Sequence, residues 1–274
     1  MLEALIFLLP PVSVCVILAG IFSYLGLHVL QRGVIFIDIA IAQIAALGTL
    51  VGIVAGIGAE SSISYFILIA FVSFASLVFS LIKKNSIEVP LEAVIGIVFG
   101  LSLAAALFIA EFVPQGADYI KETLTGSLLW VTWGKVALCA VISFVIGAFH
   151  YIFREKFIRL SEKNTEVAID GDKLWDFLFY FTLGLVVVEA VKILGVFLVF
   201  TLLVVPAAIS LIFFTGWKAR VAAAWITGSA ASVIGTAAAD KFNIPNAPSI
   251  VCLLGLLLVL AALVKISFFR KVIP

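Results

Sequence analysis

Long, nearly unbroken runs of apolar residues dominate the chain, and short polar stretches separate them. The runs are continuous rather than alternating, which favours membrane-spanning helices over the strands of a β-barrel. A spanning helix takes roughly 20 apolar residues. The pattern therefore predicts an all-α integral membrane fold, a single transmembrane domain over 1–274 with about nine spans. They are residues 4–27, 34–57, 63–82, 91–113, 135–153, 174–191, 193–214, 220–239 and 248–268.

The positions of lysine and arginine between these segments predict the orientation of the chain. If the N-terminus faces outside, only Lys121, Lys135, Lys192 and Lys241 of the 17 Lys and Arg residues lie on the outside. Because Lys and Arg resist translocation, cytoplasmic connections carry most of them. The opposite orientation would invert this bias. We therefore expect the N-terminus outside and the C-terminus inside.

Two connections are too long to be simple turns. Residues 114–134 read PQGADYIKETLTGSLLWVTWG, whose mixed polarity predicts a short outer helix or a re-entrant segment. Trp130 and Trp133 could anchor it at the interface, where aromatic residues concentrate. Residues 154–173 read REKFIRLSEKNTEVAIDGDK, the most polar stretch of the chain. It is too short for a soluble domain, so we expect a short helix on the cytoplasmic membrane surface.

Composition supports the membrane assignment and excludes several classes of protein. The chain is 64% hydrophobic and 12% charged, with a mean hydropathy of +1.30, whereas an ordinary soluble domain is about 25% charged. The net charge is only +1 and no basic run occurs, so nothing indicates nucleic-acid binding. Cys15, Cys139 and Cys252 lie in apolar segments without CxxC spacing, which argues against a disulfide framework or a zinc knuckle.

Signatures of catalysis are absent from the sequence. It contains no GxxxxGK[ST] phosphate loop, no HExxH and no GxSxG. We therefore expect a protein that is not an enzyme, binds no cofactor and does not hydrolyse ATP by the P-loop route. His28 and His150 lie near predicted cytoplasmic ends of spans, without partners at metal-ligand spacing. We interpret both as interfacial residues.

Ionisable groups inside apolar spans are the best functional candidates, because a charge there is costly and usually faces the protein interior. Asp38 lies in FIDIAIAQIAALG, just inside the second span, and Gln43 follows five residues later. On a regular helix the two side chains do not share one face. They could line one pathway if other helices surround both. Alternatively, Asp38 caps the helix start or pairs with a cytoplasmic Arg or Lys.

Three glutamates lie near the ends of spans, and two of them are open to two interpretations. Glu189 could bind a cation, or it could form an i,i+3 ion pair with Lys192. Glu92 follows Pro90 at the start of its span, where an acid suits the helix N-terminus. Glu111, near an outer end, could attract cations or be merely interfacial.

Several segments together are similar to one known family. Residues 191–210 read VKILGVFLVFTLLVVPAAIS. This stretch resembles the signature of the ABC-3 family, the permease subunits of bacterial ATP-binding-cassette (ABC) importers for zinc, manganese and iron. Residues 30–48, 92–100 and 244–251 resemble further family elements in the expected order, with Ala247 where glycine is usual. The positions that match the signature K-x-x-G, an apolar run and L-x-x-P-A-A are Lys192, Gly195, Leu203, Pro206, Ala207 and Ala208.

The resemblance implies a transporter of divalent metal cations in the bacterial cytoplasmic (inner) membrane. It implies a separate ABC ATPase, an extracytoplasmic metal-binding protein, and a homodimer or pseudo-dimer of the permease within the lipid. ATP binding by the ATPase would switch the dimer between outward and inward access. Family members dock the ATPase through a cytoplasmic coupling helix with an Ala-x-x-Gly-type element. The best match is EVAIDG within 154–173, which contains Glu166, Ala168, Asp170 and Gly171.

The second span departs from the family pattern at the expected metal site. Many zinc and manganese permeases carry Asp-x-x-x-His there, but here Gln43 takes the histidine position and Asp38 is displaced by one residue. An amide oxygen is a poor ligand for zinc, although harder cations accept it. Asp38, Gln43 and Glu189 are the predicted pathway residues, while zinc, manganese and iron all stay open as cargo.

A stand-alone secondary transporter or channel is the competing interpretation. It would use Asp38 and Glu189 as an ion or proton site. The polar connection 154–173 distinguishes the two classes, because an ATPase-dependent permease needs a docking surface there and a secondary carrier does not.

Overall fold

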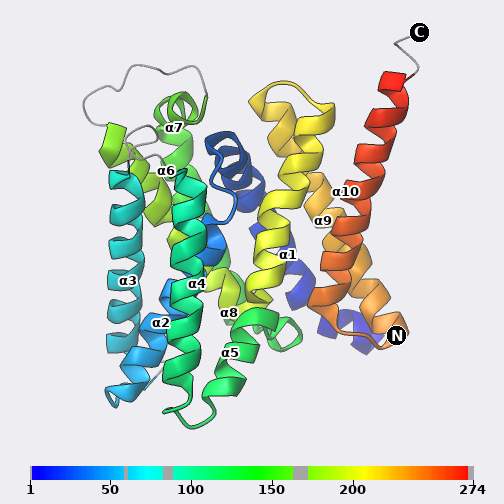
Figure 1. Cartoon of the computed structure of the whole chain (residues 1–274). Helices are drawn as coiled ribbons and strands as arrows, with labels where there is room; N and C mark the ends of the chain where they lie inside the picture. The colour runs from blue at the N-terminus through cyan, green and yellow to red at the C-terminus, as the bar shows by residue number, and fades with distance from the viewer. Residues whose placement is uncertain (1, 59–60, 83–88, 163–171, 271–274) are drawn as a thin grey trace.

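The computed structural model describes residues 2–58, 61–82, 89–162 and 172–270, and within these ranges every regular element is a helix (Figure 1). The helices are α1 (Leu2–Arg32), α2 (Ile37–Val54), α3 (Ser62–Leu81), α4 (Leu91–Ala110), α5 (Gly116–Thr125), the 3-10 helix η1 (Leu128–Trp130), α6 (Trp133–Ile152), α7 (Arg154–Ser161), α8 (Asp172–Phe213), α9 (Trp217–Phe242) and α10 (Asn246–Arg270).

Eight of the described helices are long and apolar enough to cross a membrane, one fewer than predicted. The difference arises at α8, where the predicted spans 174–191 and 193–214 join into one helix of 42 residues. At about 1.5 Å per residue a straight helix of this length would be roughly twice as long as a bilayer core is thick. Gly195, with φ 75° and ψ 160°, breaks α8 into two arms, 172–194 and 196–213.

The bend of α8 depends on two glycines whose backbones meet. Gly195 and Gly126 both have positive φ, 75° and 72°. A Cβ atom on Gly195 would collide with backbone atoms of Gly126, Thr125 and Leu124. Ser127 donates its backbone N–H to the Ile193 carbonyl at 3.0 Å. The segment between α5 and η1 therefore crosses α8 at its break and holds the two arms in place.

Both polar connections contain the short helices that the sequence predicts. Residues 114–134 form α5 and η1, and the side chains of Trp130 and Trp133 are exposed. In 154–173, α7 covers Arg154–Ser161. The predicted ATPase-coupling residues Glu166, Ala168, Asp170 and Gly171 lie outside the described residues. We call the side that holds α7 the inner side and the side that holds α5 the outer side, following the predicted orientation.

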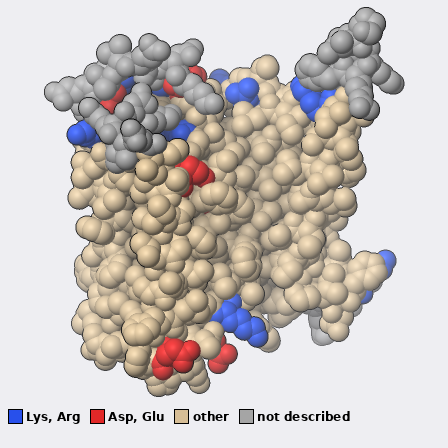
Figure 2. All heavy atoms as spheres, viewed as in Figure 1, with Lys and Arg blue, Asp and Glu red and all other residues tan. Residues whose placement is uncertain are grey.

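Charge and burial agree with a membrane bundle. In Figure 2 charged side chains gather toward the two ends of the visible face and leave a wide uncharged band between them. The chain termini lie on opposite sides of the bundle (Figure 1), as an odd number of crossings requires when each arm of α8 counts as one. The core is densest around α8, α1 and α2, where side chains such as Phe22, Ile41 and Leu183 are fully buried. Helices α4 and α6 are mostly exposed, as expected of helices that face lipid.

Candidate functional site

A cavity of about 390 Å³ lies among α2, α3, α5, α6 and α8, and it includes the predicted pathway residue Glu189. Its polar lining comes from all five helices and the segment before η1. The α2 wall is made of small side chains at helical spacing, which leaves room beside the helix. The polar residues are Thr49, Ser64, Tyr65, Tyr119, Glu122, Thr123, Ser127, Lys135, Glu189 and Lys192, and the α2 wall is Ala42, Ala45, Ala46 and Thr49.

Glu189 and Lys192 form an ion pair within this cavity. Lys192 Nζ donates to Glu189 Oε1 at 3.0 Å, the i,i+3 arrangement that the sequence allows. The same Nζ lies 4.2 Å from the centroid of the Tyr65 ring on α3. Glu122 and Lys135 add one further charge of each sign to the lining. The formal charges of the cavity therefore balance, and an incoming cation has to compete with Lys192 for Glu189.

The Tyr119 phenol that lines the cavity is held neutral by burial. Burial raises the pKa of the Tyr119 phenol on α5 above its ordinary value, so it stays protonated. The Cys139 side chain on α6 also lines the cavity and is buried. The charged oxygen donors that face the cavity are thus the carboxylates of Glu189 and Glu122.

Asp38 and Gln43 are buried in α2 but do not line the cavity. Asp38 is 1% exposed and lies in the first turn of α2, eleven residues before Thr49 on the same helix. At 1.5 Å per residue this spacing is about 16 Å. Gln43 is 2% exposed, and its Nε2 has no hydrogen-bond partner in the described part of the chain. The predicted pathway residues Asp38 and Gln43 on α2 and Glu189 on α8 therefore do not form one ligand shell.

Glu92 is an acid near Asp38 that sequence analysis assigned only to its own helix start. It lies in the first turn of α4, as predicted, and its Oε1 also accepts a hydrogen bond from the backbone N–H of Phe36, at the start of α2, at 3.2 Å. Because Phe36 is two residues before Asp38, this bond places Glu92 beside the first turn of α2. Within the described residues, neither oxygen of Asp38 accepts a hydrogen bond of normal geometry, and Arg32 pairs with Asp176 instead. The alternative that Asp38 pairs with a cation is therefore not seen in the structure.

The interpretation of the two histidines as interfacial was wrong, because both are buried. His28 Nδ1 and Ser161 Oγ are hydrogen-bonded at 2.7 Å, and His150 Nε2 and Thr182 Oγ1 at 2.8 Å. Their partners lie on helices far away in sequence, so spacing along the chain could not reveal them. Among the described residues no group of three His, Cys, Asp or Glu side chains is arranged to hold a metal ion.

Comparison with known proteins assigns the family. The model of the ABC 3 transport family matches residues 5–265, nearly the whole chain. The chain belongs to the ABC 3 transport family. The predicted resemblance and the all-helical permease fold are thereby confirmed, as is a multi-pass membrane location. A bacterial inner membrane is consistent with the bacterial sources of the relatives.

Two curated relatives and one solved structure are similar to this ABC-3 chain. A "Probable metal transport system membrane protein" of Chlamydia muridarum is 24% identical over 178 residues, 64% of this chain and 61% of the relative. A protein of the same description from Chlamydia trachomatis is 23% identical over 179 residues, 65% of this chain and 61% of the relative. The match thus spans about three fifths of the relatives' length. The structure titled "PsaBC from Streptococcus pneumoniae in complex with Fab" shares the fold, with a TM-score of 0.75 and 19% identity over 93% of this chain and 90% of that one.

Proposed function

We propose that this ABC-3 chain is the permease of an ATP-driven importer for divalent metal cations. The family match over residues 5–265 carries the proposal. The description of the Chlamydia relatives as metal transport proteins supports it. A separate ATPase supplies the energy, and an extracytoplasmic metal-binding protein delivers the cation. Two copies of the permease enclose the pathway in the bacterial inner membrane.

The cavity lined by Glu189, which we call the outer cavity, is the first cation-binding site, or outer station, of the proposed pathway. Lys192 acts as a resident cation that keeps the empty cavity neutral, because its Nζ pairs with Glu189 at 3.0 Å. When a divalent cation binds Glu189, Lys192 is displaced and the face of Tyr65, 4.2 Å away, stabilises its ammonium group. The exchange keeps the Glu189 carboxylate beside a cation throughout.

Asp38 and Glu92 form the second cation-binding site of the proposed pathway, the inner station. Asp38 is buried and lacks a hydrogen-bond partner of normal geometry among the described residues, and Glu92 Oε2 also lacks one. Two acids within electrostatic range of each other attract a divalent cation more strongly than a monovalent one. Gln43, five residues after Asp38 on α2, offers an amide oxygen. ATP-driven rearrangement would pass the cation from the outer to the inner station.

The donor set favours a hard cation as cargo. Carboxylate and amide oxygens suit manganese better than zinc, which prefers nitrogen and sulfur. Cys139 is the soft donor of the outer cavity. We therefore propose manganese as the cargo, and zinc and iron as the competitors to test against it.

The function is tested by reconstitution. The permease is purified in gentle detergent, its companions are identified by mass spectrometry, and the complex is placed in vesicles. We expect a P-loop ATPase to copurify, and ATP to drive uptake of manganese ahead of zinc and iron. Preferred uptake of zinc would overturn the choice of cargo but not the class of transporter. Cation uptake without ATP or any ATPase would instead identify a secondary transporter.

A further inference from the structure

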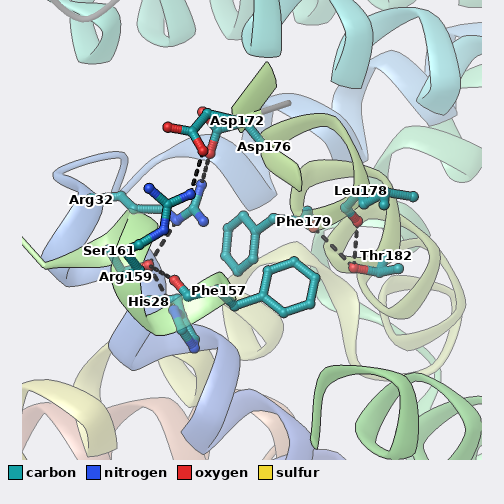
Figure 3. Close-up of polar contacts among 10 residues, drawn as sticks. All are labelled: His28, Arg32, Phe157, Arg159, Ser161, Asp172, Asp176, Leu178, Phe179 and Thr182. Atoms are coloured by element: carbon teal, nitrogen blue, oxygen red, sulfur yellow. Dashed lines mark hydrogen bonds and ion pairs between the residues drawn. The ribbon is translucent and has the colours of Figure 1, made fainter. Parts of the chain in front are cut away.

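A buried polar cluster on the inner side joins three helices around the hydroxyl of Ser161 (Figure 3). Ser161 is the last residue of α7, His28 and Arg32 are in the last two turns of α1, and Asp176 is in the second turn of α8. Ser161 and Phe157 are four residues apart on α7 and are its two buried residues. They form the face by which this short helix packs on the bundle.

Ser161 Oγ makes three hydrogen bonds. It accepts from Arg32 Nε at 2.9 Å, is bonded to His28 Nδ1 at 2.7 Å and donates to the Phe157 carbonyl at 3.1 Å. A hydroxyl has one proton and two lone pairs, so these bonds use its full capacity. The end of α7 is thereby fixed to α1 through a group that has no contact with water.

Arg32 carries the connection onward to α8. Its Nη1 donates to Asp176 Oδ1 at 2.6 Å, and its guanidinium lies 4.1 Å from the centroid of the Phe179 ring. The Arg32 side chain is only 4% exposed. The Asp176 side chain is 32% exposed, so the pair is only partly buried, but loss of Asp176 would leave the buried guanidinium without its carboxylate. Arg159 on α7 also pairs with Asp172, the first residue of α8.

The helix that receives this connection leads directly to the outer cavity. Asp176 and Glu189 belong to the first arm of α8, thirteen residues apart. At 1.5 Å per residue this spacing is about 20 Å of continuous helix. The predicted ATPase-coupling residues precede α8 and follow α7 in the sequence. A displacement of α7 therefore reaches Glu189 and Lys192 through one rigid element.

We propose that Ser161, Arg32 and Asp176 form a transmission joint that passes the movement of the ATPase to the first arm of α8. These are positioning residues, since none of them contacts the proposed cation sites. The proposal rests on the proposed function as an ATP-driven permease. It differs from a purely structural anchor in one respect: loss of the joint reduces the cation transported per ATP hydrolysed, beyond any loss of stability.

The test uses the permease–ATPase complex in vesicles, with manganese uptake, ATP hydrolysis and the melting temperature measured on each variant. Ser161→Ala is expected to retain the ATPase and its hydrolysis while uptake per ATP falls at least about tenfold, and Ser161→Thr, which keeps a hydroxyl, restores the ratio. Asp176→Asn independently removes the ion pair with Arg32 on the α8 side. Ser76→Ala is the matched control, because the buried Ser76 hydroxyl donates to the Val72 carbonyl of its own helix at 2.7 Å.

The outcomes separate the two proposals. If the wild type shows ATP-driven uptake but Ser161→Ala and Asp176→Asn keep the wild-type ratio and lose only thermal stability, the joint is a structural anchor and the inference is wrong. If the wild-type complex shows no ATP-driven uptake, the proposed function itself fails, and the joint fails with it.

Discussion

In the proposed pathway, the ion pair of Glu189 and Lys192 occupies the cation site until a divalent cation replaces Lys192. Their contact of 3.0 Å lies in a cavity that water reaches, so the pair contributes little to stability, about 1 kcal/mol or less. A divalent cation can therefore replace Lys192 without a large penalty. The pair contributes selectivity for the charge of the incoming cation rather than rigidity of the fold.

Opposite effects are expected when the two partners are neutralised. Glu189→Gln should lower manganese uptake by roughly tenfold, because the carboxylate ligand is lost. Lys192→Gln should lower the KM for the cation a few-fold, because the competing ammonium is gone. Uptake by vesicles over a range of manganese concentrations measures both. Glu111→Gln, which changes an exposed acid at the end of α4, is the control and should leave uptake unchanged. Equal uptake in all three variants would remove Glu189 from the pathway.

Asp38 is a buried acid. Its neutralisation should lower transport and raise the stability of the fold. A buried carboxylate without a compensating partner destabilises the fold, and an amide of the same shape removes that charge. Asp38→Asn should therefore raise the melting temperature in detergent while uptake per inserted molecule falls on the order of tenfold. Asp240→Asn, at an exposed acid on α9, should change neither quantity. Normal uptake in Asp38→Asn would show that Asp38 is only structural.

At the scale of elements, the bend in α8 places the outer cavity. The first arm brings Glu189 and Lys192 to the cavity, and the α5–η1 segment that crosses the break supplies Ser127 to the same lining. The Ser127 hydroxyl donates to the Lys192 carbonyl at 3.4 Å. Cavity and bend are therefore parts of one arrangement, and a change at the bend should alter the cavity.

Gly195→Ala is expected to disrupt this arrangement. At φ 75° and ψ 160° any other residue is strained by about 1–3 kcal/mol, and the new methyl group also collides with backbone at Gly126. We expect a lower melting temperature and less monodisperse protein in detergent. Gly96→Ala is the control, because nothing lies within 4 Å of the added methyl group and alanine favours the helix. If both variants were equally stable, the break at Gly195 would not be needed for the fold.

At the scale of the whole molecule, the proposed function assigns coupling to the ATPase to the inner side and entry of the cation to the outer side. The transmission joint lies on the inner side, the cavity on the outer side, and the first arm of α8 runs between them. The mostly exposed faces of α4 and α6 leave the bundle open to lipid or to a second permease. In the proposed function, transport therefore depends on movement of the bundle against the ATPase and a second permease.

A bulky residue at position 171 tests coupling from the outside of the bundle. Gly171→Trp should abolish ATP-driven uptake while insertion into the membrane stays normal, because the predicted coupling element would no longer fit the ATPase. Uptake and inserted protein are measured on the same vesicles. Gly58→Trp, at an exposed glycine on the outer side with nothing within 4 Å, is the control and should transport normally. Unchanged uptake in Gly171→Trp would discard the assignment of the coupling element.

The sequence by itself determined the class of the molecule. Apolar runs of spanning length predict membrane helices whatever surrounds them, because the bilayer forces each backbone to satisfy its hydrogen bonds within its own helix. The short helices in 114–134 and 154–173, the Glu189–Lys192 pair and the family all follow from local pattern. Each depends on residues close together in the chain.

Only the tertiary structure decided which distant residues meet. The pairing of His28 with Ser161, of Arg32 with Asp176 and of Glu92 with the start of α2 joins positions 56 to 144 residues apart. The cavity likewise combines residues from five helices. Glu189 lines it and Asp38 does not, although the sequence predicts both for one pathway. The physical reason is that helix packing in a membrane is chosen by close steric fit and buried polar partners, and these depend on all neighbours at once.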